Sequence, residues 1–500
     1  MSRSSFGANF VPGFVLTDPI GKGSSGSVFS AIRLNPPENV ALKLIEIPPG
    51  ECGAPEQCFS EIACPAGMLC NNVVPITDVM VFSKPQISTE TIGKKRHRGV
   101  GGDNSSRQPH SATGNAEKTE ERIYIAFTMP QMYCTLRSYI EHAHSGSKNM
   151  ITPEILRYVT KSILEGVCAL NFRHQSHFDL KPENILLDLS GGVRIVDFGL
   201  GRTRNSFNRE VDPSYWFEGN TMVITPGYRP IECWMAPKYL SMKADIFSVG
   251  CIVLEMIFGR IMFYKSETAF EANRDSNTKF ANFLWMLFEV LPVPSLDFWV
   301  KDGNSYDPTA LSKLKETIQR YKSSQSIRVD LGTQYDLTRL KNIASNSINH
   351  LLPDEEVKSA NMLLYQEASH LGMKPSNVLN LVLRQYGESC LEFVVSCLAY
   401  AASNRPSSQE CLSMSWITTS PTYYGSSNTR KEFARCVSHM NLSKKKKSSG
   451  DHSHLTCPTT IQSINPSSYP GNQQIVNIPH HYDGSNLQFT NIESILSRHL

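Results

Sequence analysis

Residues 177 to 187 read H-F-D-L-K-P-E-N-I-L-L, and after a short turn residues 194 to 199 read R-I-V-D-F-G. Two aspartates and one asparagine stand here where phosphoryl transfer from a nucleotide needs them. Asp179 can accept or orient the proton of a hydroxyl group, while Asn184 and Asp197 can hold Mg²⁺ against the phosphates. The alternative is a charged loop that matches by accident, but it requires two separate motifs to fall at the right spacing.

This segment resembles the catalytic loop of the eukaryotic protein kinases. Lys181, two residues beyond Asp179, can reach the moving phosphate and is typical of the serine/threonine kinases rather than the tyrosine kinases. The resemblance implies an α+β protein with the bilobal protein kinase fold, which has a small β-rich N-lobe and a larger α-helical C-lobe. It also implies ATP and Mg²⁺ as cofactors and a protein as the substrate.

A glycine-rich segment upstream, I-G-K-G-S-S-G-S-V from Ile20 to Val28, matches the loop that lies over the phosphates in kinases. Glycine permits the tight backbone geometry of such a loop, where a Cβ would clash. The glycines of the pattern are Gly21, Gly23 and Gly26. The pattern alone is weak, but apolar residues on both sides predict a strand, a turn and a second strand. Val28 would then cover the adenine from above.

The residues V-A-L-K, 40 to 43, resemble the third strand of the kinase N-lobe, whose lysine holds the α- and β-phosphates. The expected partner of Lys43 is a carboxylate on the following helix, and Glu61 in F-S-E-I is the best candidate. The alternative is a pair of unrelated surface charges. Further nucleotide contacts implied by the resemblance are Ile20, Ala41 and Leu186.

An alternating apolar run from Ile123 to Phe127 predicts a strand that leads to the connection between the lobes. The resemblance puts Phe127 at the back of the nucleotide pocket. Residues 128 to 130 would be the hinge, where backbone groups of Thr128 and Met129 meet the adenine edge. Two segments with helical spacing follow, 135–142 and 153–172, and the second would support the catalytic loop.

The segment between Asp197 and Glu232 is expected to be the activation loop, since it ends in T-P-G-Y-R-P-I-E. Glu232 resembles the last residue of the kinase A-P-E motif, and Arg405 is its expected partner in a buried, structural ion pair. Asp245 resembles the aspartate that accepts backbone hydrogen bonds from the catalytic loop.

Composition sets further limits. The net charge of the 500 residues is only +3, so no global basic field predicts direct binding of nucleic acid. The 13 cysteines show no C-x-x-C pair and indicate reduced thiols. The longest apolar stretches, 247–259 and 283–291, are too short to cross a bilayer, so no membrane association is expected.

The expected organisation is a tail at 1–13 and a kinase domain at 14–417. Changes in composition predict a disordered insertion at 84–121 and a patterned C-lobe insertion at about 301–385. The remainder, 418–500, is polar and is expected to be disordered.

The ends of these polar segments carry two further signals. Asn491–Leu500 places its apolar residues on one helical face, which fits either a docking helix or a frayed terminus. The basic runs Lys94–Arg98 and Lys444–Lys447 are typical of nuclear import sequences, with solvated charge runs as the alternative. They favour the nucleus, with the cytoplasm as the other location.

Four short motifs resemble the cell-division-cycle-seven kinases, the catalytic subunits of the replication-initiation kinase DDK. They are E-I-A-C-P-A-G-M-L-C-N-N-V-V after Glu61, I-A-F-T-M-P, T-P-G-Y-R and G-R-I-M-F-Y-K. This resemblance implies a cell-cycle kinase of DNA replication, with the MCM helicase as substrate and a regulatory subunit that is required for activity. The cyclin-dependent and related kinases are the second family, because they share Arg229 and the pattern G-C-I-x-x-E-M.

Two departures from the kinase pattern bear on activation. Phe178 stands where arginine is expected, and phenylalanine cannot pair with a phosphate on the activation loop. Pro65, four residues after Glu61, should kink or end the helix there. Both fit a kinase whose active form needs a partner. They also fit a pseudokinase scaffold, although every residue expected to touch nucleotide or metal is present.

Overall fold

The structure, a computed structural model, describes most of the chain. The described residues are 7–22, 26–47, 56–87, 119–145, 150–203, 224–235, 240–264, 276–291, 308–324, 377–419, 426–448 and 475–477. The chain divides into two compact units. The sheet unit comprises Met1–Cys58, Ile76–Gln131 and Gln462–Leu500, and the helical unit comprises Phe59–Pro75 and Met132–Ile461. The expected β-rich N-terminal part and α-helical remainder are confirmed.

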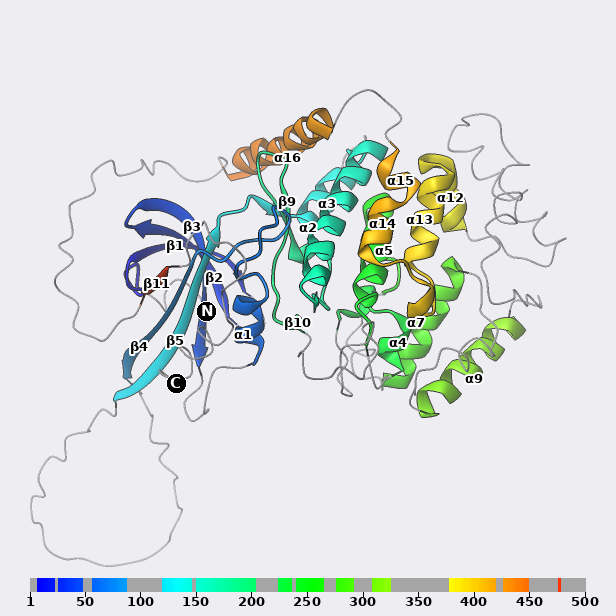
Figure 1. Ribbon diagram of the computed structural model, residues 1–500, viewed down its shortest axis with the longest axis horizontal. Coiled ribbons are helices and arrows are strands. Elements are labelled where there is room, and N and C mark those ends of the chain that lie inside the picture. Colours follow the sequence, from blue (N-terminus) through cyan, green and yellow to red (C-terminus); the bar gives the residue numbers. More distant parts are fainter. Residues whose placement is uncertain are drawn as a thin grey trace, which may run out of the picture. The chain divides into compact units, whose positions relative to one another are not determined.

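The sheet unit is an antiparallel sheet with the strand order β1-β2-β3-β5-β4-β11 (Figure 1). Its strands are β1 (Phe14–Lys22), β2 (Ser27–Leu34), β3 (Pro37–Ile47), β4 (Asp78–Ile87), β5 (Thr119–Pro130) and β11 (Ile475–Asn477). Successive residues of a strand point to opposite faces. One apolar cluster of this unit therefore draws its members from alternate positions, such as Leu42, Leu44, Met80 and Phe82.

The residues before β1 are part of this packing and are not a free tail. Val11 is 1% exposed. The ring of Phe10 meets Phe82 and Tyr124 edge-on, with centroids 6.0 and 5.1 Å apart. Such edge contacts suit the charge distribution of aromatic rings. Residues 7–13 therefore cover part of the sheet.

The boundaries expected for the first insertion were wrong at both ends. β4 and β5 remain paired out to Ile87 and Thr119, so residues 84–87 and 119–121 are strand. Backbone pairing with a neighbouring strand overrides the polar composition of these ends. Residues 88–118 and the basic run Lys94–Arg98 lie outside the described residues.

The helical unit contains long helices and a few short strands. The helices are α2 (Leu136–His144), α3 (Pro153–Phe172), α4 (Ile231–Trp234), α5 (Ala244–Phe258), α7 (Ser276–Val290), α9 (Pro308–Ser324), α12 (Asn377–Tyr386), α13 (Glu388–Cys397), α14 (Ser408–Ser413), α15 (Ser415–Thr418) and α16 (Ser426–Ser448). The 3₁₀ turns are η2 (Pro182–Asn184), η3 (Pro226–Tyr228) and η4 (Ala402–Asn404), and the short strands are β6 (Cys134–Thr135), β7 (Gln175–Ser176), β8 (Ile185–Leu187), β9 (Val193–Ile195) and β10 (Arg202–Thr203). Helix α1 (Glu56–Ala63) begins in the sheet unit and ends in the helical unit.

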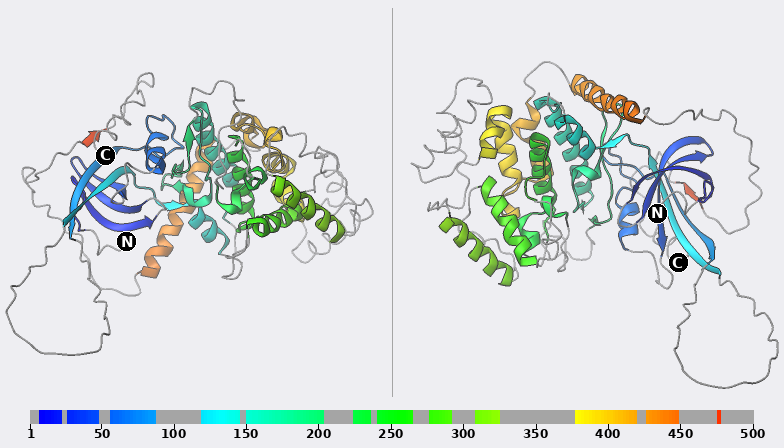
Figure 2. Two further views of the ribbon diagram at one scale, coloured as in Figure 1. Left: turned by 90° about the horizontal axis from the view of Figure 1, so that it is seen from below. Right: turned by 180° about the vertical axis from the view of Figure 1, so that it is seen from behind.

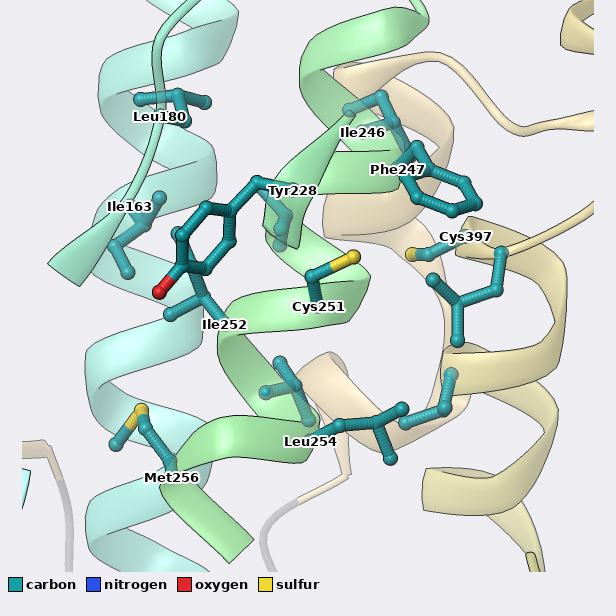
Figure 3. Packing of buried hydrophobic residues seen from close by; sticks show 14 of the residues in the cluster. Ile163, Leu180, Tyr228, Ile246, Phe247, Cys251, Ile252, Leu254, Met256 and Cys397 are labelled. Atoms are coloured by element: carbon teal, nitrogen blue, oxygen red, sulfur yellow. The ribbon is translucent and has the colours of Figure 1, made fainter. Parts of the chain in front are cut away.

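Helix α5 is the centre of the helical unit. All its residues from Ala244 to Ile257 are buried, as its unbroken apolar sequence predicts. Figure 3 shows it between α3 and α13, with Cys251, Ile252 and Leu254 pointing into the packed core. Gly259 ends the helix in the left-handed conformation that glycine adopts without strain. This buried helix is the support on which the site residues of the unit rest.

The expected C-lobe insertion contains two described helices, α9 and α12, in agreement with its patterned sequence. Figure 2 shows α9 beside α7. Leu379 and Val382 of α12 are 3% and 0% exposed in the core of the unit. Residues 325–376 are outside the described part of the chain.

The expectation of a disordered tail after residue 417 was wrong for two segments. Helix α16 packs against α2 and α3, and its Phe433, Val437 and Met440 are buried (Figure 1). β11 pairs with β4 in the sheet unit. The run Lys444–Lys447 belongs to α16. Burial of an apolar stripe at i, i+4 and i+7 stabilises a helix that is polar on its other faces. Residues 491–500 are not among the described residues.

Among the described residues, no helix combines the length and the apolar content needed to span a membrane.

Candidate active site

The carboxylate of Asp179 is the centre of a dense hydrogen-bond cluster in the helical unit. Lys181 Nζ donates to its Oδ2 at 2.6 Å, and Asn184 Nδ2 donates to the same oxygen at 3.2 Å and to the Asp179 carbonyl at 2.9 Å. Thr225 Oγ1 donates to Oδ1 at 2.6 Å and accepts from Lys181 Nζ at 2.9 Å. These hydrogen bonds fix the orientation of the Asp179 carboxylate, as a proton acceptor requires.

Asp245, at the start of α5, accepts hydrogen bonds from the backbone of the catalytic loop, as expected. Its two oxygens accept the backbone N–H groups of His177 and Phe178 at 2.8 and 2.9 Å. Burial raises the pKa of this carboxyl, and the bonds from His177 and Phe178 act in the opposite direction. Phe178 itself is fully buried with φ of +55°. This left-handed conformation bends the backbone directly before Asp179.

Asn184 and Asp197 fit the expected role of metal ligands. The amide nitrogen of Asn184 is committed to Asp179, so its carbonyl oxygen points the other way. A carbonyl and a carboxylate oxygen are the hard ligands that Mg²⁺ prefers, usually with substrate phosphates completing the shell. Asp197 has φ of +68°, an uncommon conformation for a non-glycine residue that recurs at functional sites. Neither observation tests metal binding, which stays a prediction.

Glu61 is buried and lies close to the segment that follows Asp197. A Cβ built on Gly199 would stand 3.1 Å from Glu61 Oε1 and 3.5 Å from Asp197 Oδ1, so the Glu61 carboxylate lies directly against this glycine. Helix α1 ends at Ala63, two residues before Pro65, as expected. The carboxylate therefore belongs to a short helix that ends within one turn.

The sheet unit holds all the residues expected to bind nucleotide except Leu186, which belongs to the helical unit. Val28 on β2 is paired with Lys43 on β3, and Lys43 is buried. Gly26 is required by close packing, because a Cβ there would come within 2.4 Å of the Leu44 carbonyl oxygen. Gly23 is not described. The expected ion pair of Lys43 with Glu61 joins residues of different units and stays a prediction.

Residues 128–130, the predicted hinge, form the last part of strand β5. β5 stays paired with β3 through Pro130, and the Thr128 carbonyl accepts the N–H of Thr77 at 2.9 Å. The segment of the sheet unit that contains β5 extends to Gln131, so Thr128, Met129 and Pro130 all belong to this unit. Phe127 and Met129 have side chains on the same face of β5, paired with Lys43 and Ala41. Nucleotide contact by these residues remains a prediction, as it does for Ile20, Gly21 and Leu186.

The predicted pair of Glu232 and Arg405 is confirmed. Arg405 Nη1 and Nη2 lie 2.6 and 2.7 Å from the two carboxylate oxygens, and both side chains are buried. Arg405 also donates to the carbonyls of Ala399 and Tyr400 and lies 5.1 Å from the ring centre of Phe247. The guanidinium is fully satisfied, so this pair is structural.

Two functional features were missed by the sequence reasoning. Thr225 touches both Asp179 and Lys181, although the motif T-P-G-Y-R was used only as a family marker. Arg137 on α2 bonds to Glu183 of the catalytic loop at 2.8 Å and also contacts Glu255 on α5. In the sequence, Thr225 is only a hydroxyl residue in a short motif and Arg137 is only one charged residue among many. Such residues are too common to indicate a functional role.

The residue before Thr225 is held in an unusual conformation. Ile224 has φ of +69°, which is rare for a β-branched side chain. Arg229 Nε and Nη2 donate to its carbonyl at 2.9 and 2.6 Å, and the Arg229 guanidinium lies 4.6 Å from the ring centre of Trp234. These two hydrogen bonds keep the Ile224 carbonyl pointing toward the Arg229 guanidinium.

A comparison with family models identifies this arrangement. Residues 14–417 match the model described as the protein kinase domain, which covers most of the chain. The chain belongs to the protein kinase family. A protein kinase domain implies a nucleoside triphosphate, in general ATP, together with a divalent metal ion.

The individual proteins that resemble this chain share a quarter to about a third of their residues with it over the aligned segments. Cyclin-dependent kinase 2 of Caenorhabditis elegans is 25% identical over 306 residues, which are 60% of this chain and 67% of that protein. The meiotic mRNA stability protein kinase SSN3 of Saccharomyces cerevisiae is 34% identical over 161 residues, 32% of this chain and 28% of that protein. The chain thus spans less than a third of SSN3. The solved yeast RNA polymerase II CTD kinase CTDK-1 complex has a TM-score of 0.48 and 15% identity, covering 83% of this chain and 95% of that one.

Proposed function

We propose that this protein is a serine/threonine kinase that transfers the γ-phosphoryl group of ATP to hydroxyl groups of protein substrates. The observation that supports it best is the contact of Thr225 with Asp179. A threonine hydroxyl donates to Oδ1 at 2.6 Å while Lys181 donates to the same hydroxyl. This is the contact that an acceptor serine or threonine must make with a proton acceptor and a neighbouring cation.

In the proposed step the acceptor oxygen forms a bond to the γ-phosphorus. The bond from that phosphorus to the β,γ-bridging oxygen breaks, ADP leaves with the electron pair, and the hydroxyl proton passes to Asp179. Lys181 offsets negative charge on the transferred group. Asn184 and Asp197 would hold Mg²⁺, which when bound neutralises charge on the phosphates. Lys43 would position the α- and β-phosphates.

The experiment that tests this proposal is transfer of labelled phosphate from ATP to a protein with serine and threonine acceptors. We expect Asp197→Ala and Lys43→Met to abolish transfer, because the first removes an anionic metal ligand and the second misplaces the phosphates. Chelation of divalent cations should stop the reaction and added Mg²⁺ should restore it. Wild-type rates in both variants would refute the site. ATP binding without transfer by the wild type would favour the pseudokinase.

A regulatory partner is part of the proposal. α1 ends at Ala63, so little helix supports Glu61 on its C-terminal side. Phe178 is buried and offers no cation to an activation-loop phosphate. Ordering of the active form must then come from packing, which a bound regulatory subunit would supply. The relative named cyclin-dependent kinase 2 is consistent with partner control.

For the subfamily, two candidates remain in our proposal. The four short motifs favour a DDK-like kinase that acts on the MCM helicase. The cyclin-dependent-like alternative is favoured by Ile224, whose carbonyl is occupied by Arg229 beside the catalytic centre. A peptide N–H opposite that carbonyl would lack an acceptor, whereas proline after the acceptor residue has no N–H to leave unpaired.

Peptide pairs with Ser-Pro and Ser-Ala, together with purified MCM helicase, discriminate between the two candidates. A Ser-Pro peptide that reacts at least about tenfold faster supports the cyclin-dependent-like candidate, since tenfold corresponds to about 1.4 kcal/mol. Efficient reaction with MCM and no proline preference supports the DDK-like candidate.

For location we propose the nucleus, on the basis of the two basic runs. Replacing Lys94–Arg98 and Lys444–Lys447 with serine and glycine should leave the tagged protein in the cytoplasm. Unchanged nuclear fluorescence would rule out this role, as would a wild-type protein that never enters the nucleus.

A further inference from the structure

Arg137 occupies a position between two carboxylates next to the catalytic loop. Its Nε donates to Glu183 Oε1 at 2.8 Å, its Nη1 contacts Glu255 Oε1, and its Nη2 donates to Tyr228 Oη at 2.6 Å. Tyr228 donates in turn to Glu255 Oε2 at 2.5 Å. The Glu255 side chain is fully buried, whereas 44% of the Glu183 side chain is exposed. The cluster therefore has a closed side in the core and an open side at the surface.

The cluster lies within reach of a bound substrate. Glu183 follows Asp179 by four residues, and with about 3.8 Å between successive Cα atoms their Cα atoms are at most about 15 Å apart. Tyr228 follows Thr225, which touches Asp179 directly, by three residues. An extended peptide advances about 3.3 Å per residue. Side chains within about four residues of the acceptor hydroxyl can thus approach Glu183.

Without Arg137, the carboxylates of Glu183 and Glu255 would attract a cation from a bound substrate. Two carboxylates and a phenol converge there, and carboxylates bind guanidinium groups through paired charge-assisted hydrogen bonds. Burial alone would lower the pKa of Arg137, but the bonds to Glu183 and Tyr228 outweigh it and raise that pKa. The guanidinium of Arg137, on α2, lies between these groups as a permanent cation of the protein itself.

We propose that Arg137 is a specificity-determining residue that takes the position of a basic substrate side chain. Because Arg137 already neutralises Glu183 and Glu255, the kinase does not select arginine or lysine near the acceptor hydroxyl. Its substrates are segments in which a basic residue is not required. This inference rests on the proposed kinase function and adds a feature of the substrate class.

The test uses the 500-residue chain and sets of serine peptides that differ only in arginine or glutamine at each position within four residues of the acceptor. We expect Arg137→Met to prefer the arginine peptide at one or more positions at least about tenfold more than the wild type does, in kcat/KM. Arg137→Lys is the matched control, because it keeps a cation and should keep the wild-type preference. The gain should shrink at high salt, since Glu183 is partly exposed.

A second variant makes the test independent of how well Arg137→Met folds. Glu183→Gln in the wild-type background should leave the ratio of arginine to glutamine peptides within about twofold, because Glu183 is held by Arg137 and not by substrate. In the Arg137→Met background the same change should remove most of the gain.

Two results would overturn the inference while leaving the proposed function intact. One is a folded, active Arg137→Met with an unchanged peptide preference, as expected if the cluster only stabilises the fold. The other is a tenfold loss on arginine peptides caused by Glu183→Gln alone. A wild-type protein that phosphorylates no peptide would overturn the proposed function as well.

Discussion

Two ion pairs in the helical unit have the same separation but different surroundings. Lys181 Nζ lies 2.6 Å from Asp179 Oδ2, and Arg405 Nη1 lies 2.6 Å from Glu232 Oε1. The first pair is partly open, with side-chain exposures of 22% and 12%, and the second is closed, with 0% and 4%. Distance therefore does not distinguish the pair that we propose to be catalytic from the structural one.

The difference lies in what surrounds each pair. The partners of Asp179 include the hydroxyl of Thr225, a group that a substrate hydroxyl resembles. Arg405 is surrounded by fixed carbonyls and the ring of Phe247, none of which a ligand could replace. A buried pair loses much when one member is removed, because the other charge stays unpaired in a medium of low polarity. An open pair can exchange partners with little change in stability.

The first and largest effect should come from Asp179→Asn. We expect the rate of phosphate transfer to fall on the order of 10²- to 10⁴-fold, the usual contribution of a positioned proton acceptor. The thermal unfolding midpoint should barely change, since asparagine has the same shape and the site is partly solvated. Both quantities are measured on the same preparation. If Asp179→Asn lowered the unfolding midpoint strongly but left turnover per folded molecule normal, the two ion pairs would not differ as we propose.

Arg405→Met should have the opposite profile. It leaves Glu232 buried and unpaired, which costs about 3–5 kcal/mol of stability. Thermal melts should show a clear drop in the midpoint, while turnover of the molecules that remain folded in the cold changes by only a few-fold. The control is Arg405→Met with Glu232→Leu, which removes the stranded charge and should recover much of the loss. An unstable double variant and a stable single one would contradict this view.

Thr225→Ala tests whether the open pair depends on the hydroxyl. We expect kcat to fall about tenfold, with a smaller change in KM, because Asp179 loses the hydrogen bond that orients Oδ1. Thr225→Ser keeps the hydroxyl and is the matched control. Equal rates for alanine and serine would mean that the contact at 2.6 Å has no part in positioning the carboxylate.

The smallest effect is expected in the activation loop. Ser206, Ser214 and Thr221 lie outside the described residues. Because Phe178 provides no cation for a phosphate, alanine at these three sites should leave activity within a few-fold. Phosphatase treatment of the purified kinase, followed by assay with and without cell extract, provides the measurement. The isolated protein should be much slower than the protein with extract, and a collapse on dephosphorylation without rescue would favour a phosphate switch.

Much of the fold could be predicted from local patterns. The helix of residues 153–172 and the two strands on either side of residues 23–26 follow from periodicity and glycine placement, and the helix and both strands are confirmed. The ends of β4 and β5 could not be predicted, since their residues are polar and are ordered by pairing with each other. Helix α16 was missed for a related reason. Its stripe of Phe433 and Val437 was readable, but the lysines beside it dominated the composition.

The site divides in the same way. Asp179, Lys181 and Asn184 lie within six residues, so the spacing alone predicts that their side chains meet, and they do. Thr225 comes 46 residues after Asp179, and Arg137 comes 118 residues before Glu255. No local pattern could pair them, because the chain brings them together only when α2, α5 and the catalytic loop pack.

By itself, the sequence determined the family, the fold class and the candidate chemistry, because short motifs with strict spacing carry their geometry within a few residues. It also predicted that α1 kinks or ends near Pro65, and α1 does end at Ala63. Only the tertiary structure decided that β5 runs through Pro130, that the Ile224 carbonyl is turned to Arg229, and that Arg137 fills the acidic place beside Glu183. Those three depend on groups brought together by burial of apolar surface, which acts without direction and across any distance along the chain.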